Sequence, residues 1–150
     1  MEVSGLFTYP IKACAGVSLE QANLTPRGLR QDRWMMLVDP EDQFLTQREC
    51  PTLGQVHPTL DKATLTVNAP GMEPLRLELQ PTGSCRDVVV WRSTCAAIDQ
   101  GNAVADWFSQ YLGRPVRLVR AVRVVAVALA IACMLTMTLL LPLWVFVIEP

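Results

Sequence analysis

Short apolar stretches separated by turn residues fill the first 92 residues of the chain. The clearest is 75–80, where leucines alternate with polar side chains. This period of two is typical of a β-strand with one buried and one solvent-exposed face. Similar stretches, separated by turn residues, lie at residues 3–9, 17–24, 34–38, 43–47, 63–67 and 88–92. Seven short strands at a spacing of about ten residues predict a small β-barrel or β-sandwich.

One helix is predicted after these strands. Six apolar residues share one helical face: Ala103, Val104, Trp107, Phe108, Tyr111 and Leu112. An amphipathic stripe of this kind packs against a core. Asp99 suits the N-cap position, and Gly113 followed by Pro115 suits the end of the helix, because glycine adopts the left-handed conformation there. Residues 116–119 are predicted to form a further strand, so the fold class is mainly β with one or two helices.

The C-terminal region differs in composition from the rest of the chain. Residues 124–148 are 25 consecutive uncharged and mostly apolar residues, whereas residues 1–123 contain all 13 basic and 13 of the 14 acidic side chains. A helix of that length, rising about 1.5 Å per residue, can cross a hydrocarbon core of about 30 Å. Three arginines precede the run and one glutamate follows it. By the positive-inside rule this asymmetry predicts a hydrophobic transmembrane helix with the N-terminal region in the cytoplasm.

Two other interpretations of this run stay open. It could pack into a soluble core, although a helix that is apolar on every side needs more cover than the roughly 120 preceding residues can provide. It could also be the product of a shifted reading frame, because the composition changes abruptly after Arg120. All three interpretations are compatible with the sequence.

Charge and cysteine content narrow the function. The formal net charge of −1 argues against a nucleic-acid-binding protein, because neutralising phosphates requires an excess of Lys and Arg. The five cysteines form no C-x-x-C pair, and charged residues interrupt the first twenty positions, where a secretory signal would need an apolar run. We therefore expect a cytoplasmic protein with reduced cysteines and no zinc site.

Three segments of the chain resemble one protein family. Residues 6–17, LFTYPIKACAGV, resemble the YPIKSCxG opening of MOSC (molybdenum-cofactor sulfurase C-terminal) N-terminal β-barrel domains, found in bacterial YcbX-type proteins and in the mitochondrial amidoxime-reducing component. Residues 28–39, GLRQDRWMMLVD, resemble the family's GLxxDRxWMLVD, and residues 44–51, FLTQRECP, resemble its FLTARQxP. Residues 90–119 resemble the entry to the MOSC domain itself.

The resemblance implies a domain organisation. Residues 1–92 would form the MOSC N-terminal β-barrel, residues 93–120 the start of the MOSC domain, and residues 121–150 the hydrophobic tail. In the family the chain continues past the point, near Arg120, at which the match ends. That continuation carries the cysteine that ligates molybdenum and most pterin contacts. We therefore expect this chain to be truncated within the MOSC domain.

The resemblance also implies a cofactor site. The family binds a molybdenum–pterin cofactor (molybdopterin), whose phosphate and oxo groups are anionic and require fixed cations. The family's cofactor contacts correspond to Lys12 and Arg33, and Arg48 lies in the matching TxR motif, where it would either contact the anion or brace the hairpin. The serine that follows the lysine in the family is Ala13 here, which removes one hydroxyl donor. No catalytic or metal-ligating residue is assigned to this chain.

The expected function follows from these assignments. Full-length relatives are implied to be oxidoreductases that reduce N-hydroxylated compounds with electrons from a redox partner, which this sequence does not identify. We expect this chain to retain no cofactor and to catalyse no reaction alone, because cations without a cysteine anchor give weak binding. The alternatives are a membrane-anchored β-barrel binding module held by residues 124–148, or an enzyme that completes its site with another chain.

Overall fold

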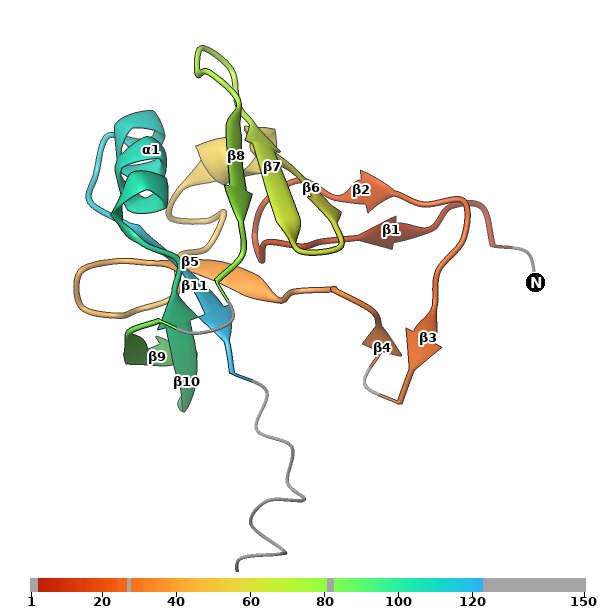
Figure 1. The fold of residues 1–150 in the computed structure, drawn as a ribbon, viewed down its shortest axis with the longest axis horizontal. Coiled ribbons are helices and arrows are strands. Elements are labelled where there is room, and N and C mark those ends of the chain that lie inside the picture. The colour runs from red at the N-terminus through yellow and green to blue at the C-terminus, as the bar shows by residue number, and fades with distance from the viewer. Residues whose placement is uncertain (1–2, 27, 81–82, 123–150) are drawn as a thin grey trace, which may run out of the picture.

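Four antiparallel sheets and one α-helix make up the computed structural model (Figure 1), which describes residues 3–26, 28–80 and 83–122. The largest sheet has four strands in the order β5-β11-β10-β9. Their bounds are Met35–Val38 for β5, Cys85–Val90 for β9, Ser93–Asp99 for β10 and Arg117–Ala121 for β11. The predicted class, mainly β with a helix, is confirmed for this part of the chain.

The four-stranded sheet is closed by residues 42–44. Phe44 pairs with Val38 of β5, and on the other side its N–H donates to the Val89 carbonyl of β9 at 3.0 Å. The Val89 N–H in turn donates to the Asp42 carbonyl at 2.9 Å. The segment therefore joins the two outer strands, and closure of this kind removes exposed strand edges. The strand predicted at 43–47 is wrong as a regular strand, because these residues form isolated bridges to two neighbours instead of one continuous ladder.

Both faces of β5 are buried. Met35 and Leu37 belong to the main core cluster, whereas Met36 and Val38 belong to a second cluster that also contains Val88. Successive side chains of a strand point to opposite faces, so a strand covered on both sides reads as a continuous apolar run. This explains why the sequence MMLV shows no alternation.

A three-stranded sheet packs against the main core. Its strands follow the order β6-β7-β8 and span His57–Asp61, Thr64–Asn68 and Leu75–Glu78. Leu65 and Val67 of β7 are fully buried in the main core cluster. The strands predicted at 63–67 and 75–80 are confirmed within two residues at each end, because alternation on a half-buried sheet leaves a readable pattern.

Two short ribbons lie on the side of the molecule away from the helix (Figure 1). One pairs β1 (Phe7–Thr8) with β2 (Val17–Ser18), and the other pairs β3 (Leu24–Thr25) with β4 (Gly28–Leu29). The strands predicted at 3–9 and 17–24 are therefore much shorter than expected. A 3-10 helix, η1 (Pro51–Gln55), lies between β5 and β6 in the chain and buries Leu53.

The helix α1 spans Asn102–Leu112 and covers the core with Phe108, which is fully buried. Burial of a phenylalanine side chain contributes about 2 kcal/mol. Gly113 ends the helix in the left-handed conformation with φ of 65°, as predicted. The prediction of Asp99 as N-cap is wrong: Gly101 holds that position without a side-chain cap. Asp99 instead belongs to β10, where its carboxylate forms an ion pair with Arg117.

Two of the longer strands, β6 and β10, were missed in the sequence, as was the two-residue β4. β6 contains Pro58, a residue that disfavours a strand assignment, and β10 reads STCAAID, in which small residues hide the alternation. Arg92, the proposed domain boundary, lies in the turn between β9 and β10, so strands from both sides of it share one sheet. The apolar run 124–148 lies outside the described residues; among the described ones, no helix has both the length and the apolar character to cross a membrane.

Candidate functional site

A depression of about 410 Å³ contains all three predicted contact residues. Lys12, Arg33 and Arg48 line it together with the aromatic side chains of Tyr9 and Phe44. Trp91 completes the aromatic part of the rim. None of the residues that line it is acidic, so the cations are not neutralised by a carboxylate within the depression itself.

The backbone of the loop after β1 fixes the position of Lys12. The Lys12 N–H donates to the Met35 carbonyl at 2.8 Å, which ties the loop to the first residue of β5. Ala13 adopts a left-handed φ of 68°, and its carbonyl accepts a 2.8 Å hydrogen bond from the Gln47 side chain. A Cβ at Gly16 would lie 2.8 Å from the Tyr9 ring, so a larger residue there would force the ring to move. The motif residues around Lys12 therefore serve to shape the loop.

Arg33 is tied to the same loop through Tyr9. The Arg33 N–H donates to the Tyr9 carbonyl at 2.7 Å, and the Tyr9 N–H donates to the Asp32 carboxylate at 2.9 Å. The Arg33 guanidinium lies 3.4 Å from the Asp32 carboxylate, and its side chain is 63% exposed. Arg33 thus forms a surface ion pair and lines the depression as well. An exposed pair contributes little to stability, so the guanidinium remains available to a ligand.

The ammonium group of Lys12 lies over aromatic rings. Its Nζ is 4.0 Å from the Phe44 ring centroid and 6.0 Å from that of Trp91. Burial lowers the pKa of Lys12, and the positive charge of Arg33 lowers it further, while Cys95 opposes the shift. Within the described part of the chain Lys12 forms no ion pair. A bound anion would stabilise the charged form of Lys12, which this environment disfavours.

Arg48 lies in a tight turn in which the Glu49 N–H donates to the Thr46 carbonyl at 3.2 Å. Glu49 stabilises this turn by accepting 3.0 Å hydrogen bonds from the N–H and the hydroxyl of Thr46. The Arg48 side chain is exposed and, within residues 3–26, 28–80 and 83–122, forms no ion pair. Of the two roles expected for Arg48, contact with an anion therefore agrees better with the geometry than bracing the hairpin.

Cys14 also lines the depression but is a poor metal ligand. The residue is 2% exposed, and burial raises the pKa of its thiol to about 12. A metal ligand must be a thiolate, and a thiol in an apolar environment stays protonated at neutral pH. No group of three or more His, Cys, Asp or Glu side chains suited to a metal ion occurs among the residues that the structure places. The described residues of the depression fit an anionic group, and Cys14 among them is unsuited to bind a metal ion.

The sequence did not identify the aromatic residues of this site. Phe44 lies in the segment that closes the barrel, and Trp91 lies in the turn of the β9–β10 hairpin. They meet edge to face, with ring centroids 6.1 Å apart and an interplanar angle of 70°. Because the two residues are far apart in the chain, the sequence does not reveal that they pair. A tryptophan in a turn is nevertheless a signal, because turn residues are exposed and tryptophan is usually buried.

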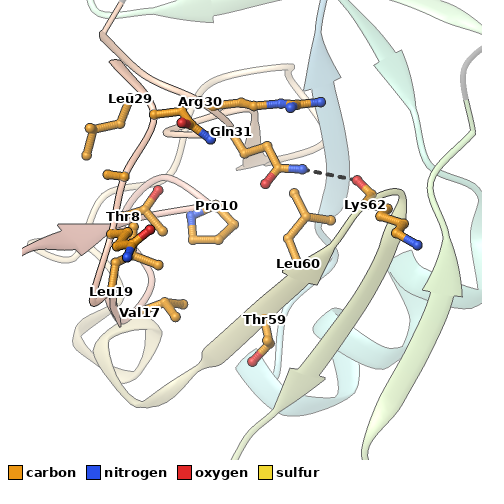
Figure 2. Close-up of a pocket in the computed structure, with 13 residues that line it drawn as sticks. Thr8, Pro10, Val17, Leu19, Leu29, Arg30, Gln31, Thr59, Leu60 and Lys62 are labelled. Carbon is orange, nitrogen blue, oxygen red and sulfur yellow. Dashed lines mark hydrogen bonds between the residues drawn. The ribbon is translucent and has the colours of Figure 1, made fainter. Parts of the chain in front are cut away.

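A second depression, of about 320 Å³, lies between the β1–β2 ribbon and the β6–β7 hairpin (Figure 2). It is also lined by two cations, Arg30 and Lys62, and by no acidic residue. Figure 2 shows both side chains extending away from Thr8 on the far wall. The Gln31 amide donates to the Lys62 carbonyl at 3.1 Å, so it holds the two walls together.

Comparison with known proteins identifies the family. The family model of the MOSC N-terminal beta barrel domain matches residues 1–115 of the chain. The chain belongs to this family. The family name agrees with the closure of the four-stranded sheet by residues 42–44.

Two relatives of this chain have names that state a function. Mitochondrial amidoxime reducing component 2 of Rattus norvegicus is 37% identical over 116 residues, which are 73% of this chain and 34% of that protein. Molybdenum cofactor sulfurase of Danio rerio is 31% identical over 125 residues, which are 79% of this chain and 15% of that protein. The chain thus spans about a third or less of the length of these relatives.

One solved structure supports the fold. The solution structure of a Bordetella bronchiseptica protein matches with a TM-score of 0.60 and 22% sequence identity. The match covers 81% of this chain and 91% of the other. At this identity the similarity concerns the fold, which therefore recurs in a separately solved protein.

Proposed function

We propose that the depression around Lys12, Arg33 and Arg48 binds the anionic end of a molybdenum–pterin cofactor. The observation that carries the proposal is the convergence of three cations from separate segments on a depression lined by no carboxylate. The names of the relatives, a molybdenum cofactor sulfurase and an amidoxime reducing component, indicate the cofactor. The chain would then contribute one wall of a cofactor site in an oxidoreductase that acts on N-hydroxylated compounds.

The chemistry of the cations suits a phosphate. Arg33 and Arg48 can each donate two hydrogen bonds to one anionic group, whereas Lys12 provides a point charge in the same depression. A hydrogen bond to a charged group contributes about 1.5–3 kcal/mol. The Phe44 ring beneath Lys12 restricts its hydration, which strengthens the attraction of the ammonium for an anion.

The proposal assigns no catalysis to the described residues. When bound, the molybdenum centre would supply the redox chemistry, and Lys12, Arg33 and Arg48 would hold the cofactor in place. Cys14 is a neutral, buried thiol. The part of the chain seen in the structure contains no cluster of three or more side chains suited to bind a metal ion. We therefore expect the chain alone to show no reductase activity and to bind only the organic, anionic part of the cofactor.

Titration of the purified full chain with neopterin 3′-phosphate tests the proposal. In isothermal titration calorimetry, Lys12→Gln and Arg33→Gln should each weaken binding about tenfold, which corresponds to about 1.4 kcal/mol. Arg30→Gln and Lys62→Gln are matched controls, because they remove the same charges from the second depression. The controls should change affinity less than twofold. Equal losses in both pairs of variants would mean that net charge alone determines binding, and the proposal would fail.

A second candidate function follows from the 25 uncharged residues at 124–148. These residues have the length and composition of a membrane anchor, so the β-barrel could act as a binding module at a membrane surface. Extraction of membranes with alkaline carbonate distinguishes the two locations. An anchored protein stays in the pellet, whereas release of all the protein into the supernatant excludes the anchor.

A further inference from the structure

Trp91 occupies a position that packing does not explain. The residue is 68% exposed, although tryptophan is a large apolar side chain that is buried on average. It lies in the two-residue turn between β9 and β10 with a left-handed φ of 59°. Bulky residues rarely adopt this conformation, and hairpin turns place glycine or asparagine there. Strained residues of this kind gather at functional sites, so the indole calls for a functional explanation.

Trp91 lines the cation depression and lies near two of its other residues, Phe44 and Lys12. Its edge-to-face contact with Phe44 limits rotation of the indole, and the Lys12 ammonium lies 6.0 Å from the indole centroid. Phe44 is the closer aromatic partner of Lys12, at 4.0 Å. Trp91 is therefore not required to hold the ammonium, and its exposed ring surface remains open beside the charged group.

We propose that the exposed indole of Trp91 stacks on a flat heteroaromatic ring whose anionic substituent binds Lys12 and Arg33. This inference rests on the proposed function, which it deepens by assigning the ring end of the ligand to a residue. Trp91 and the cations line the same depression, so a ligand with a bicyclic ring and a short phosphate arm would contact both. Offset stacking of aromatic rings favours such a ligand over a simple phosphate.

Two probes of similar charge separate ring recognition from anion recognition. The full chain is titrated with neopterin 3′-phosphate, which has a ring, and with glycerol 3-phosphate, which has none. Trp91→Leu should weaken binding of the pterin phosphate about tenfold and leave the affinity for glycerol phosphate within twofold of the wild type. Trp91→Phe keeps an aromatic face and should recover most of the loss. Arg92→Ala, in the same turn, is the matched control and should bind both probes as the wild type does.

Fluorescence gives a second readout that a purely structural role would not change. Subtracting the Trp91→Phe signal from the wild-type signal isolates the emission of Trp91, and the pterin phosphate should quench this difference while glycerol phosphate should not. Equal binding of the pterin phosphate by the wild type and Trp91→Leu overturns the stacking proposal and leaves the cation site intact. An equal loss for both probes in Trp91→Leu also overturns it, because the residue would then only shape the Lys12 loop. Failure of the wild type to bind either probe overturns both proposals.

Discussion

Two charged clusters in this protein differ in how their charges are balanced. In the first, Asp99 pairs with Arg117 and Arg86, and Arg86 also donates to Asp42 at 2.7 Å. Two acids and two bases leave this cluster without net charge. In the second, Lys12, Arg33 and Arg48 line one depression that contains no acidic residue. Each charge of the first cluster has a partner of opposite sign. In the second cluster only Arg33 has one, Asp32 at 3.4 Å, and within the described residues Lys12 and Arg48 form no ion pair.

The balanced cluster stabilises the main sheet. The Asp99 side chain is 3% exposed, and it accepts hydrogen bonds from the Arg117 guanidinium and from the Gly101 N–H at 2.8 Å. Burial by itself raises the pKa of the Asp99 carboxyl, but the hydrogen bonds from Arg117 and Gly101 and the charges of Arg117 and Arg86 outweigh this effect and hold the pKa below its ordinary value. Asp99 in β10 and Arg117 in β11 therefore connect neighbouring strands.

The pKa values of Asp99 and Lys12 are both lowered, and this one direction has opposite consequences for an acid and for a base. The folded protein favours the charged form of Asp99 and disfavours the charged form of Lys12. Groups that stabilise a fold are held in their charged form by partners, whereas a site that waits for a ligand keeps an unfavourable charge.

The largest expected effect comes from removing the charge of Asp99. Asp99→Asn should lower the free energy of unfolding by about 3 kcal/mol, because it leaves a partly buried arginine without its carboxylate. Urea denaturation at neutral pH measures this change. Because the pKa of Asp99 is depressed, its stabilisation is present above the ordinary carboxyl pKa and is lost as the pH falls through the folded pKa. The difference between wild type and variant should therefore shrink in acid.

Asp42→Asn serves as the matched control for this prediction. The Asp42 side chain is 28% exposed and pairs only with Arg86 among the ion pairs of the described residues, so its loss should cost clearly less. The folded Asp99→Asn protein should bind neopterin 3′-phosphate with wild-type affinity. A loss of affinity in this variant would show that the two clusters are coupled, and the comparison would no longer hold.

The pH dependence of ligand affinity gives an intermediate effect. The pKa of Lys12 lies below its ordinary value of 10.5, so the ammonium loses its proton as the pH rises toward that value from below. Affinity for neopterin 3′-phosphate should fall about tenfold over this range, since one charged donor is lost. Lys12→Arg keeps its charge throughout and should give a flat profile. Calorimetric titrations between pH 7 and about pH 10.5 measure both curves; a parallel fall in Lys12→Arg would assign the titration to another group.

The smallest expected effect is on stability at the cation site. Lys12→Met should change the free energy of unfolding by no more than about 0.5 kcal/mol, with a stabilising sign at neutral pH, because it removes a charge that the folded state disfavours. This difference in the free energy of unfolding should disappear as the pH rises from the folded-state pKa of Lys12 toward 10.5, because loss of the Lys12 proton then favours folding of the wild type. Thermal melts of both proteins at several pH values test this. A marked loss of stability in Lys12→Met would show that Lys12 is a structural residue.

Much of the fold could be predicted where local pattern and tertiary environment agree. The alternation in β8 and the glycine after α1 are visible in the sequence because each reflects a single local requirement. β10 was missed because its small residues show no period, and its position depends on pairing with β9 and β11. The boundary placed after Arg92 divides a hairpin whose pairing no local signal reveals.

The candidate site shows the same division. The resemblance to the MOSC family assigned Lys12, Arg33 and Arg48, and the structure brings all three to one depression. The convergence depends on hydrogen bonds between Tyr9 and the Asp32–Arg33 segment and between Gln47 and Ala13. These bonds join residues far apart in the chain, so spacing alone does not predict them.

The sequence by itself determined the mainly β class, the position of the helix and the identity of the basic residues, because turn chemistry, periodicity and family motifs are local properties. Only the tertiary structure decided that residues 42–44 close the sheet, that Asp99 neutralises Arg117 instead of capping α1, and that Phe44 and Trp91 frame Lys12. These features arise from contacts between distant segments. Their energies depend on burial and on the balance of nearby charges, which form only when the chain folds.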